Sequence, residues 1–219
     1  MLPEIFKLFW KTVERKDARR INSQTPPTEI EQFCDIQYID DGLWQHRLDV
    51  FSKSGKLSHC PVIIDIHGGG GMYGTKEINK NYCLVLAQND YVVVNINYRL
   101  APDFSVADQL RDCFFAFKWV STNIEKYGGD LNNVFVTGDS AGGFLAAYSA
   151  LLNSSEKLRR IFGVTESGLE FRACGLTSPV CFMNTHTFQD VYYSRVKGKE
   201  FSESTLRGFE NFDAVLNKG

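Results

Sequence analysis

The sequence contains no long hydrophobic run of the kind that forms a membrane-spanning helix. No apolar segment approaches the roughly 20 residues that a membrane-spanning helix needs. The first ten residues contain apolar patches, but Glu4 and Lys7 interrupt them and no small-residue cleavage site follows. We therefore expect no signal peptide and no stable insertion into a membrane.

Paired cysteine motifs and an excess of charge are also missing. The six cysteines are scattered along the chain, with no C-x-x-C pair and no histidine nearby at zinc spacing. This usage indicates reduced, mostly buried thiols, and it predicts a cytoplasmic protein without a metal site or an organic cofactor. The net charge of −2 gives no reason to expect nucleic acid or an anionic membrane as a partner.

Length and composition, by contrast, are ordinary. The 219 residues suffice for one domain with a real core, and 43% of them are hydrophobic and 23% charged. The sequence shows no internal repeat and no low-complexity tract. It therefore predicts a single globular domain over residues 1–219.

The most informative stretch is residues 133–143, Asn-Val-Phe-Val-Thr-Gly-Asp-Ser-Ala-Gly-Gly. It reads as a short buried strand, a Gly-x-Ser-x-Gly turn and then an apolar helix, which is the context of a nucleophile elbow. Gly138 and Gly142 would let the strand and the helix approach without Cβ clashes. Ser140 would project its hydroxyl above the sheet, with a helix N-terminus behind it that favours negative charge. Ser140 is therefore the candidate nucleophile.

A second motif follows another buried-strand pattern, at residues 60–66. His67 is followed there by four glycines, residues 68–71. A glycine run after a strand exposes backbone N–H groups, and acyl transfer needs such donors to hold the oxyanion. A flexible, phosphate-binding turn is the alternative, but no Gly-Lys-Ser/Thr follows, so a P-loop is not expected.

Three blocks together carry a family resemblance. His-Gly-Gly-Gly at residues 67–70, Asn-Tyr-Arg-Leu-Ala-Pro at 97–102 and Gly-Asp-Ser-Ala-Gly-Gly at 138–143 resemble the hormone-sensitive-lipase-like branch of the α/β-hydrolases, over about residues 60–180. The resemblance implies a serine carboxylesterase or lipase acting on a small-molecule ester. It further implies that Ser140 is the nucleophile, that the amides of Gly69, Gly70 and Ala141 form the oxyanion hole, and that His67 orders the glycine loop.

Strand and helix patterns alternate along the chain, which predicts an α/β fold with a mostly parallel, doubly wound sheet and helices on both faces. Within the domain we expect an N-terminal cap helix and linker over residues 1–32, a sheet core over 33–180 and the start of a cap insertion over 181–219. The individual predictions are helices at 3–20, 78–89 and 103–127, a hairpin of strands 33–39 and 43–51, and strands at 60–66, 91–97, 133–137 and 173–178.

The N-terminal helix is amphipathic, and two roles fit it. The resemblance implies a part in a cap over the active site, whereas an apolar face beside a charged one also suits attachment to a membrane surface. Because the charges on its polar face are mixed in sign, we favour the docked helix.

The sequence does not supply a convincing base for Ser140. A serine needs a base, usually histidine, oriented by a carboxylate, and in this fold the acid and then the histidine follow the serine. His186 is the one histidine after Ser140, and a set of His186 with Asp190 would reverse that order. We expect instead that His46 and His59 lie on the surface, that Asp139 holds the turn and that Asp130 is a loop residue.

We therefore expect the triad acid and base beyond residue 219, with the C-terminal strands of the fold missing as well. The strand at 173–178 would then be an exposed sheet edge, open to self-association or to a complementing chain. A fragment of an ordinary esterase, one half of a split protein and a degenerate product all fit this pattern. A non-catalytic binder of a small ligand is the main functional alternative, and a peptidase or acyltransferase on the same fold is a weaker one.

Overall fold

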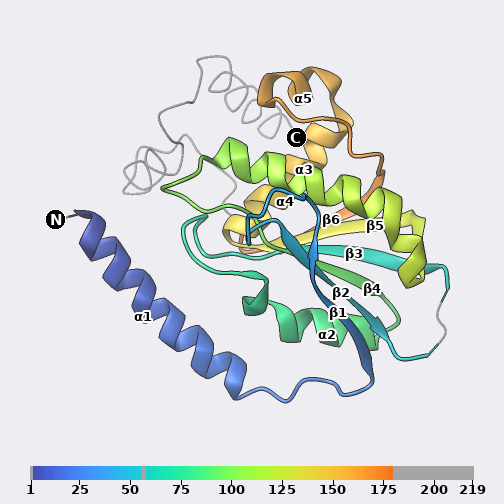
Figure 1. Cartoon of the computed structure of the whole chain (residues 1–219), viewed down its shortest axis with the longest axis horizontal. Helices are drawn as coiled ribbons and strands as arrows, with labels where there is room; N and C mark the ends of the chain where they lie inside the picture. The colour runs from blue at the N-terminus through green and yellow to red at the C-terminus, as the bar shows by residue number, and fades with distance from the viewer. Residues whose placement is uncertain (1, 56–57, 180–219) are drawn as a thin grey trace.

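The computed structural model describes residues 2–55 and 58–179, with side chains from residue 8, and it shows one twisted sheet between helices (Figure 1). Within this part of the chain the sheet has the strand order β1-β2-β4-β3-β5-β6. The strands β4, β3, β5 and β6 are parallel, whereas β1 and β2 run antiparallel to their neighbours. The predicted, mostly parallel sheet is therefore confirmed. The strands are β1 (Ile30–Gln37), β2 (Arg47–Lys53), β3 (Cys60–Ile66), β4 (Val92–Ile96), β5 (Gly129–Asp139) and β6 (Phe171–Thr177).

Helices cover both faces of the sheet, as expected for a doubly wound fold. Side chains alternate along each strand, so Val94 of β4 packs in the larger cluster with α3 and α4, whereas its neighbour Val93 packs with α2 on the other face. The helices and helical turns are α1 (Leu2–Asn22), η1 (Lys76–Ile78), α2 (Lys80–Gln88), α3 (Val106–Asn123), η2 (Ile124–Tyr127), α4 (Ala141–Ser154) and α5 (Glu156–Phe162). None of these helices combines the length and the apolarity needed to cross a membrane.

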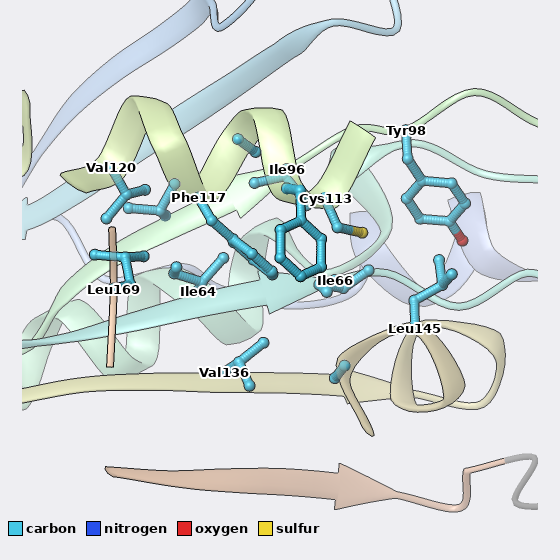
Figure 2. Packing of buried hydrophobic residues seen from close by; sticks show 14 of the residues in the cluster. Ile64, Ile66, Ile96, Tyr98, Cys113, Phe117, Val120, Val136, Leu145 and Leu169 are labelled. Carbon is cyan, nitrogen blue, oxygen red and sulfur yellow. The ribbon is translucent and has the colours of Figure 1, made fainter. Parts of the chain in front are cut away.

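The main core lies between the sheet and the helices α3 and α4. Figure 2 shows Ile64 and Val136 of the sheet facing Phe117 and Val120 of α3, all of them fully buried. Each such side chain stabilises the fold by roughly 1.5–3 kcal/mol relative to its exposed state. This packing fixes the positions of β3 and β5, which are adjacent and parallel. Because both strands end at the same edge of the sheet, the two segments that follow them meet there.

The predicted hairpin is present, but its second strand begins later than expected. The strands β1 and β2 pair antiparallel, with Ile30 opposite Lys53. Residues 43–46 are not part of β2, because the Leu43 N–H donates to Asp41 Oδ1 and His46 turns inward to contact the same carboxylate. Such a local carboxylate–backbone bond is an alternative to the strand ladder.

The helix predicted at residues 103–127 is shorter than expected. It begins at Val106, because Ser105 and Asp108 form a capping box: the Ser105 N–H donates to Asp108 Oδ2, and the Asp108 N–H donates to Ser105 Oγ. At its other end the chain tightens into η2 before Gly128. The short helix α5, which starts at the capping residue Ser155, was not predicted at all.

The strand predicted at 173–178 is β6, which pairs only with β5 in the described sheet and so lies at its edge. The predicted cap insertion at 181–219, together with His186 and Asp190, lies outside the described residues.

Candidate active site

Ser140 occupies a sharp turn between β5 and α4. Its φ of 50° and ψ of −114° lie in a region that residues with a side chain rarely adopt. The turn is tight because two glycines flank it: a Cβ on Gly138 would collide with the carbonyl of Gly142, and one on Gly142 would collide with the Ile66 carbonyl at the end of β3. This is the strained strand-to-helix geometry of a nucleophile elbow.

Hydrogen bonds hold the backbone N–H and the carbonyl of Ser140, whereas its side chain is not used to cap the helix. The Ser140 N–H donates to the Thr177 carbonyl of β6 at 2.9 Å, and the Ser140 carbonyl accepts from Phe144 N–H at 3.0 Å. The hydroxyl does not cap α4. Ser140 instead lines a cleft at the first turn of that helix, where the helix dipole favours a developing negative charge.

The glycine loop after β3 is fixed through its carbonyl groups. Gly69, Gly70 and Gly71 all have positive φ, and a Cβ on Gly69 would collide with the Tyr73 carbonyl. The Gly69 carbonyl accepts from Tyr73 N–H at 3.0 Å, and the Gly71 carbonyl accepts from Gln109 Nε2 at 2.8 Å. The loop is therefore a defined structure, and glycine is required where the backbone has this conformation.

His67 lies beneath this loop. It is fully buried and its ring stacks on Tyr98 at 4.4 Å, while the Tyr98 hydroxyl donates to the His67 carbonyl at 2.8 Å. Its Nδ1 lies 2.7 Å from the Gly68 carbonyl, so Nδ1 carries the proton and donates. Burial lowers the pKa of His67 to about 4. Its Nδ1 is tied to the loop and its buried Nε2 has no hydrogen-bond partner among the described residues, Ser140 included, which fits the predicted ordering role better than that of a base.

Two carboxylates, of the buried Asp65 and the half-buried Asp139, lie where the loop meets the elbow. Asp139 Oδ1 accepts from the Gly68 N–H and from Asn79 Nδ2, each at 2.9 Å, and the same Asn79 nitrogen donates to Asp65 Oδ2 at 2.9 Å. Asp139 was predicted to hold the turn, and its side-chain hydrogen bonds instead tie the end of β5 to the glycine loop and to Asn79. Burial first, and then the charge of Asp139, raise the pKa of Asp65 to about 7. The role of Asn79 and Asp65 was not foreseen, although a carboxylate inside the apolar strand pattern 62–66 was a signal.

The helix α1 forms one wall of the cleft above Ser140. The cleft has a volume of about 350 Å³. Trp10 of α1 stacks on Tyr73 at 5.5 Å with an interplanar angle of 18°. The cleft is lined by Trp10, Val13, Asp17 and Arg20 of α1 and by Gly68, Gly69, Gly70, Tyr73, Ile78, Asn79, Asp139 and Ser140. Ser140 and the glycine loop, which are far apart in the sequence, therefore line the same cleft.

Residues 48–184, more than half of the chain, match the BD-FAE family. The chain belongs to the BD-FAE family. It is thus an α/β-hydrolase of the hormone-sensitive-lipase-like group, which confirms the resemblance noted in the sequence.

Individual relatives of this BD-FAE chain are similar over part of their length. Esterase B from Lactobacillus rhamnosis has a solved structure with a TM-score of 0.82 at 29% identity, covering 96% of this chain and 65% of that one. Carboxylesterase NlhH of Mycobacterium tuberculosis is 33% identical, covering 64% of this chain and 45% of that protein. Versiconal hemiacetal acetate esterase of Dothistroma septosporum is 36% identical, covering 44% of this chain and 30% of that protein. The chain therefore spans less than half the length of these two curated relatives.

The histidines of this BD-FAE chain do not all lie where the sequence suggested. His59 is exposed, as expected, but His46 is only 2% exposed and the prediction of a surface position is wrong. The His46 ring bridges two carboxylates, with Nδ1 2.7 Å from Asp41 Oδ2 and Nε2 3.2 Å from Asp112 Oδ1. Burial alone would lower the pKa of His46, but the hydrogen bonds and charges of Asp112 and Asp41 outweigh it and raise the pKa.

Asp130 also differs from its prediction as a loop residue, because β5 already begins at Gly129. Its carboxylate accepts from the Asn132 N–H and from Asn133 Nδ2, so it shapes an irregular start of the strand. In the part of the chain that the structure describes, no histidine bonds to Ser140, and no group of His, Cys, Asp and Glu is arranged to hold a metal ion.

Proposed function

We propose that this chain carries the nucleophile and the oxyanion hole of a carboxylic ester hydrolase. The observation that carries the proposal is the position of Ser140: a strained turn at the start of α4, facing the glycine loop across one cleft. Relatives of the chain are named esterases and carboxylesterases, which supports an ester as the substrate class.

The proposed reaction follows from this geometry. Ser140 Oγ attacks the ester carbonyl carbon as its proton passes to a base, and the carbonyl oxygen becomes an oxyanion. The amides of Gly69, Gly70 and Ala141 hold that oxyanion, assisted by the dipole of α4. The C–O bond then breaks, the alcohol leaves with a proton, and Ser140 is acylated. Water attacks the acyl group in the same way, releases the carboxylic acid and regenerates the hydroxyl.

The base is the part of this proposal that the described residues do not provide. His46 has both ring nitrogens occupied by carboxylates, and His67 is fully buried with no hydrogen bond from its Nε2 to Ser140. We propose that the base comes from outside the described residues, either as His186 or from a longer protein. Without a triad histidine, turnover falls by a factor on the order of 10⁶.

The test compares the purified 219-residue chain with Ser140→Ala on a short-chain nitrophenyl ester, with and without added imidazole as a substitute base. We expect hydrolysis that depends on Ser140, either unaided or only with imidazole, and a phosphonate probe that labels the Ser140 peptide in mass spectrometry. If turnover is unaided, His186→Ala should abolish it.

Equal rates for the two folded proteins, with and without imidazole, and no labelling would contradict the proposal. Saturable binding of an ester by such an inert chain would then favour the alternative, a non-catalytic binder of small ligands.

A further inference from the structure

We propose that the outward face of α1 binds the surface of an anionic lipid bilayer. This binding does not depend on the chemistry proposed for Ser140. The outward face consists of the exposed side chains Leu8, Phe9, Lys11, Arg15, Lys16 and Arg19.

The face is defined by how α1 meets the rest of the molecule. The half-buried side chains of α1 from residue 8 on are Trp10, Val13, Asp17 and Ile21, which form a stripe at helical spacing. Because successive residues turn by about 100°, Leu8, Arg15 and Arg19 lie on the side of the helix opposite to this stripe. Figure 1 shows α1 on the outside of the fold, apart from the helices that pack on the sheet. One long side of the helix is therefore open.

From residue 8 on, the charges of α1 are sorted by sign around the helix. Asp17 lines the cleft, and the charges of Asp17 and Glu14 both raise the pKa of Tyr73, so both acids lie on the Tyr73 side of the helix, Asp17 half-buried and Glu14 exposed. Arg20, on the same side, pairs with Asp17 at 3.4 Å. The remaining cations of residues 8–20 are the four of the outward face.

The sequence alone, which shows a mixture of signs, argued against a membrane surface, and the net charge of −2 argued against an anionic partner. The fold separates the signs and leaves a local cluster of positive charge. Among the described residues, none of its four members, Lys11, Arg15, Lys16 and Arg19, forms an ion pair.

Two exposed apolar side chains favour a bilayer over a polyanion such as nucleic acid as the partner of the outward face. Leu8 is 67% exposed and Phe9 is 56% exposed, beside the cations at the N-terminal end of the face. A double-stranded nucleic acid would contact the cations through its phosphates and leave both side chains in water, and a single strand could stack a base on Phe9 but would not bury Leu8. A bilayer takes both groups, because apolar side chains enter the boundary of the acyl chains while lysine and arginine reach the lipid headgroups.

Binding through the outward face would bring the cleft at Ser140 close to the lipid surface. The opposite side of the same helix lines the cleft at Ser140, through Trp10, Val13 and Asp17. A chain that rests on α1 would hold this cleft within one helix diameter, about 10 Å, of the lipid surface.

Sedimentation with vesicles tests the proposal on the full 219-residue chain. We expect binding to phosphatidylcholine vesicles that contain about 30% phosphatidylserine, little binding to pure phosphatidylcholine, and release at 1 M salt, where the Debye length is about 3 Å. Replacing all four cations of the face by glutamine should weaken binding by a factor of roughly 600, since each charge contributes roughly fivefold.

Matched variants make the outcome decisive. Changing Lys118, Lys126, Lys157 and Arg160, which are exposed elsewhere, to glutamine alters the net charge equally and should leave most of the binding intact. Leu8→Ser with Phe9→Ser should weaken binding at unchanged charge. Circular dichroism confirms that each variant is folded.

Three results would overturn the proposal: equal losses in the outward-face and control charge variants, no binding to the anionic vesicles, or full binding by the Leu8→Ser, Phe9→Ser protein. The last would mean simple attraction to any polyanion, and heparin should then compete fully with the vesicles.

Discussion

Gly142 controls how closely the helix behind Ser140 can approach the sheet. Its Cα faces the carbonyls of Ile66 and His67 at the end of β3, with no room for a methyl group. Because both neighbours are backbone atoms, they cannot move aside as a flexible side chain could. The absence of a side chain at position 142 is therefore what allows α4 to approach the end of β3 so closely.

We expect Gly142→Ala to destabilise the fold by about 1–3 kcal/mol or more, because the new Cβ overpacks against backbone. Urea unfolding measures this change. Gly175→Ala is the control, since its Cβ would stand 3.1 Å from the Thr137 side chain, which can shift. A Gly142→Ala protein as stable as this control would contradict the prediction, because it would show that α4 can move away from the sheet without lowering the free energy of unfolding.

Asp65 makes the stability of the fold dependent on pH. Burial first, and then the charge of Asp139, raise its pKa from 3.8 to about 7 in the folded chain. The folded state thus binds a proton that the unfolded chain has already lost, so its stability falls as pH rises between about 4 and 7. The slope from this one group is about 1.4 kcal/mol per pH unit.

Asp65→Asn keeps an oxygen that can accept from Asn79 Nδ2 and removes the titration. We expect urea unfolding from pH 5 to pH 8 to show a shallower decline for this variant than for the parent chain. Parallel declines in the two proteins would mean that Asp65 does not carry the effect. His46, whose pKa is also raised, is present in both and cancels from the comparison.

At the scale of helices and strands, the sequence predicted the elements whose signals are local. The buried strands around Ile64, Val94 and Val136 have continuous apolar patterns, and the elbow and glycine loop are contiguous motifs. The boundary errors have equally local causes that were overlooked, namely the capping box at Ser105 and the Asp41 turn before β2.

Contacts between distant residues could not be predicted in the same way. His46 meets Asp112 across 66 residues of sequence, and Asn79 meets Asp139 across 60. Nothing in a periodic pattern says which buried carboxylate will face which polar partner. For the same reason, the sequence of α1 shows only a mixture of charge signs, and the docking of the helix shows which side of it each charge occupies.

At the scale of the whole molecule, β6 forms one edge of the described sheet. Beyond β6 no further strand pairs in residues 2–55 and 58–179, and Leu176 of β6 is 42% exposed. Beside it a groove of about 280 Å³ runs over Ile63, Phe135 and Ala173 on the sheet. Unpaired strand edges with apolar neighbours are templates for pairing with another chain.

We propose that this edge associates with a second copy of the chain or with a complementing chain. Sedimentation velocity at several concentrations should then show self-association of the 219-residue protein. Leu176→Lys should shift the distribution toward monomer, because a charged side chain on an edge strand opposes pairing. Phe115→Lys is the matched control, since Phe115 is 41% exposed on α3, on a different part of the surface. A monomeric parent chain would rule out self-association through β6, and equal shifts in the two variants would rule out β6 as the associating edge.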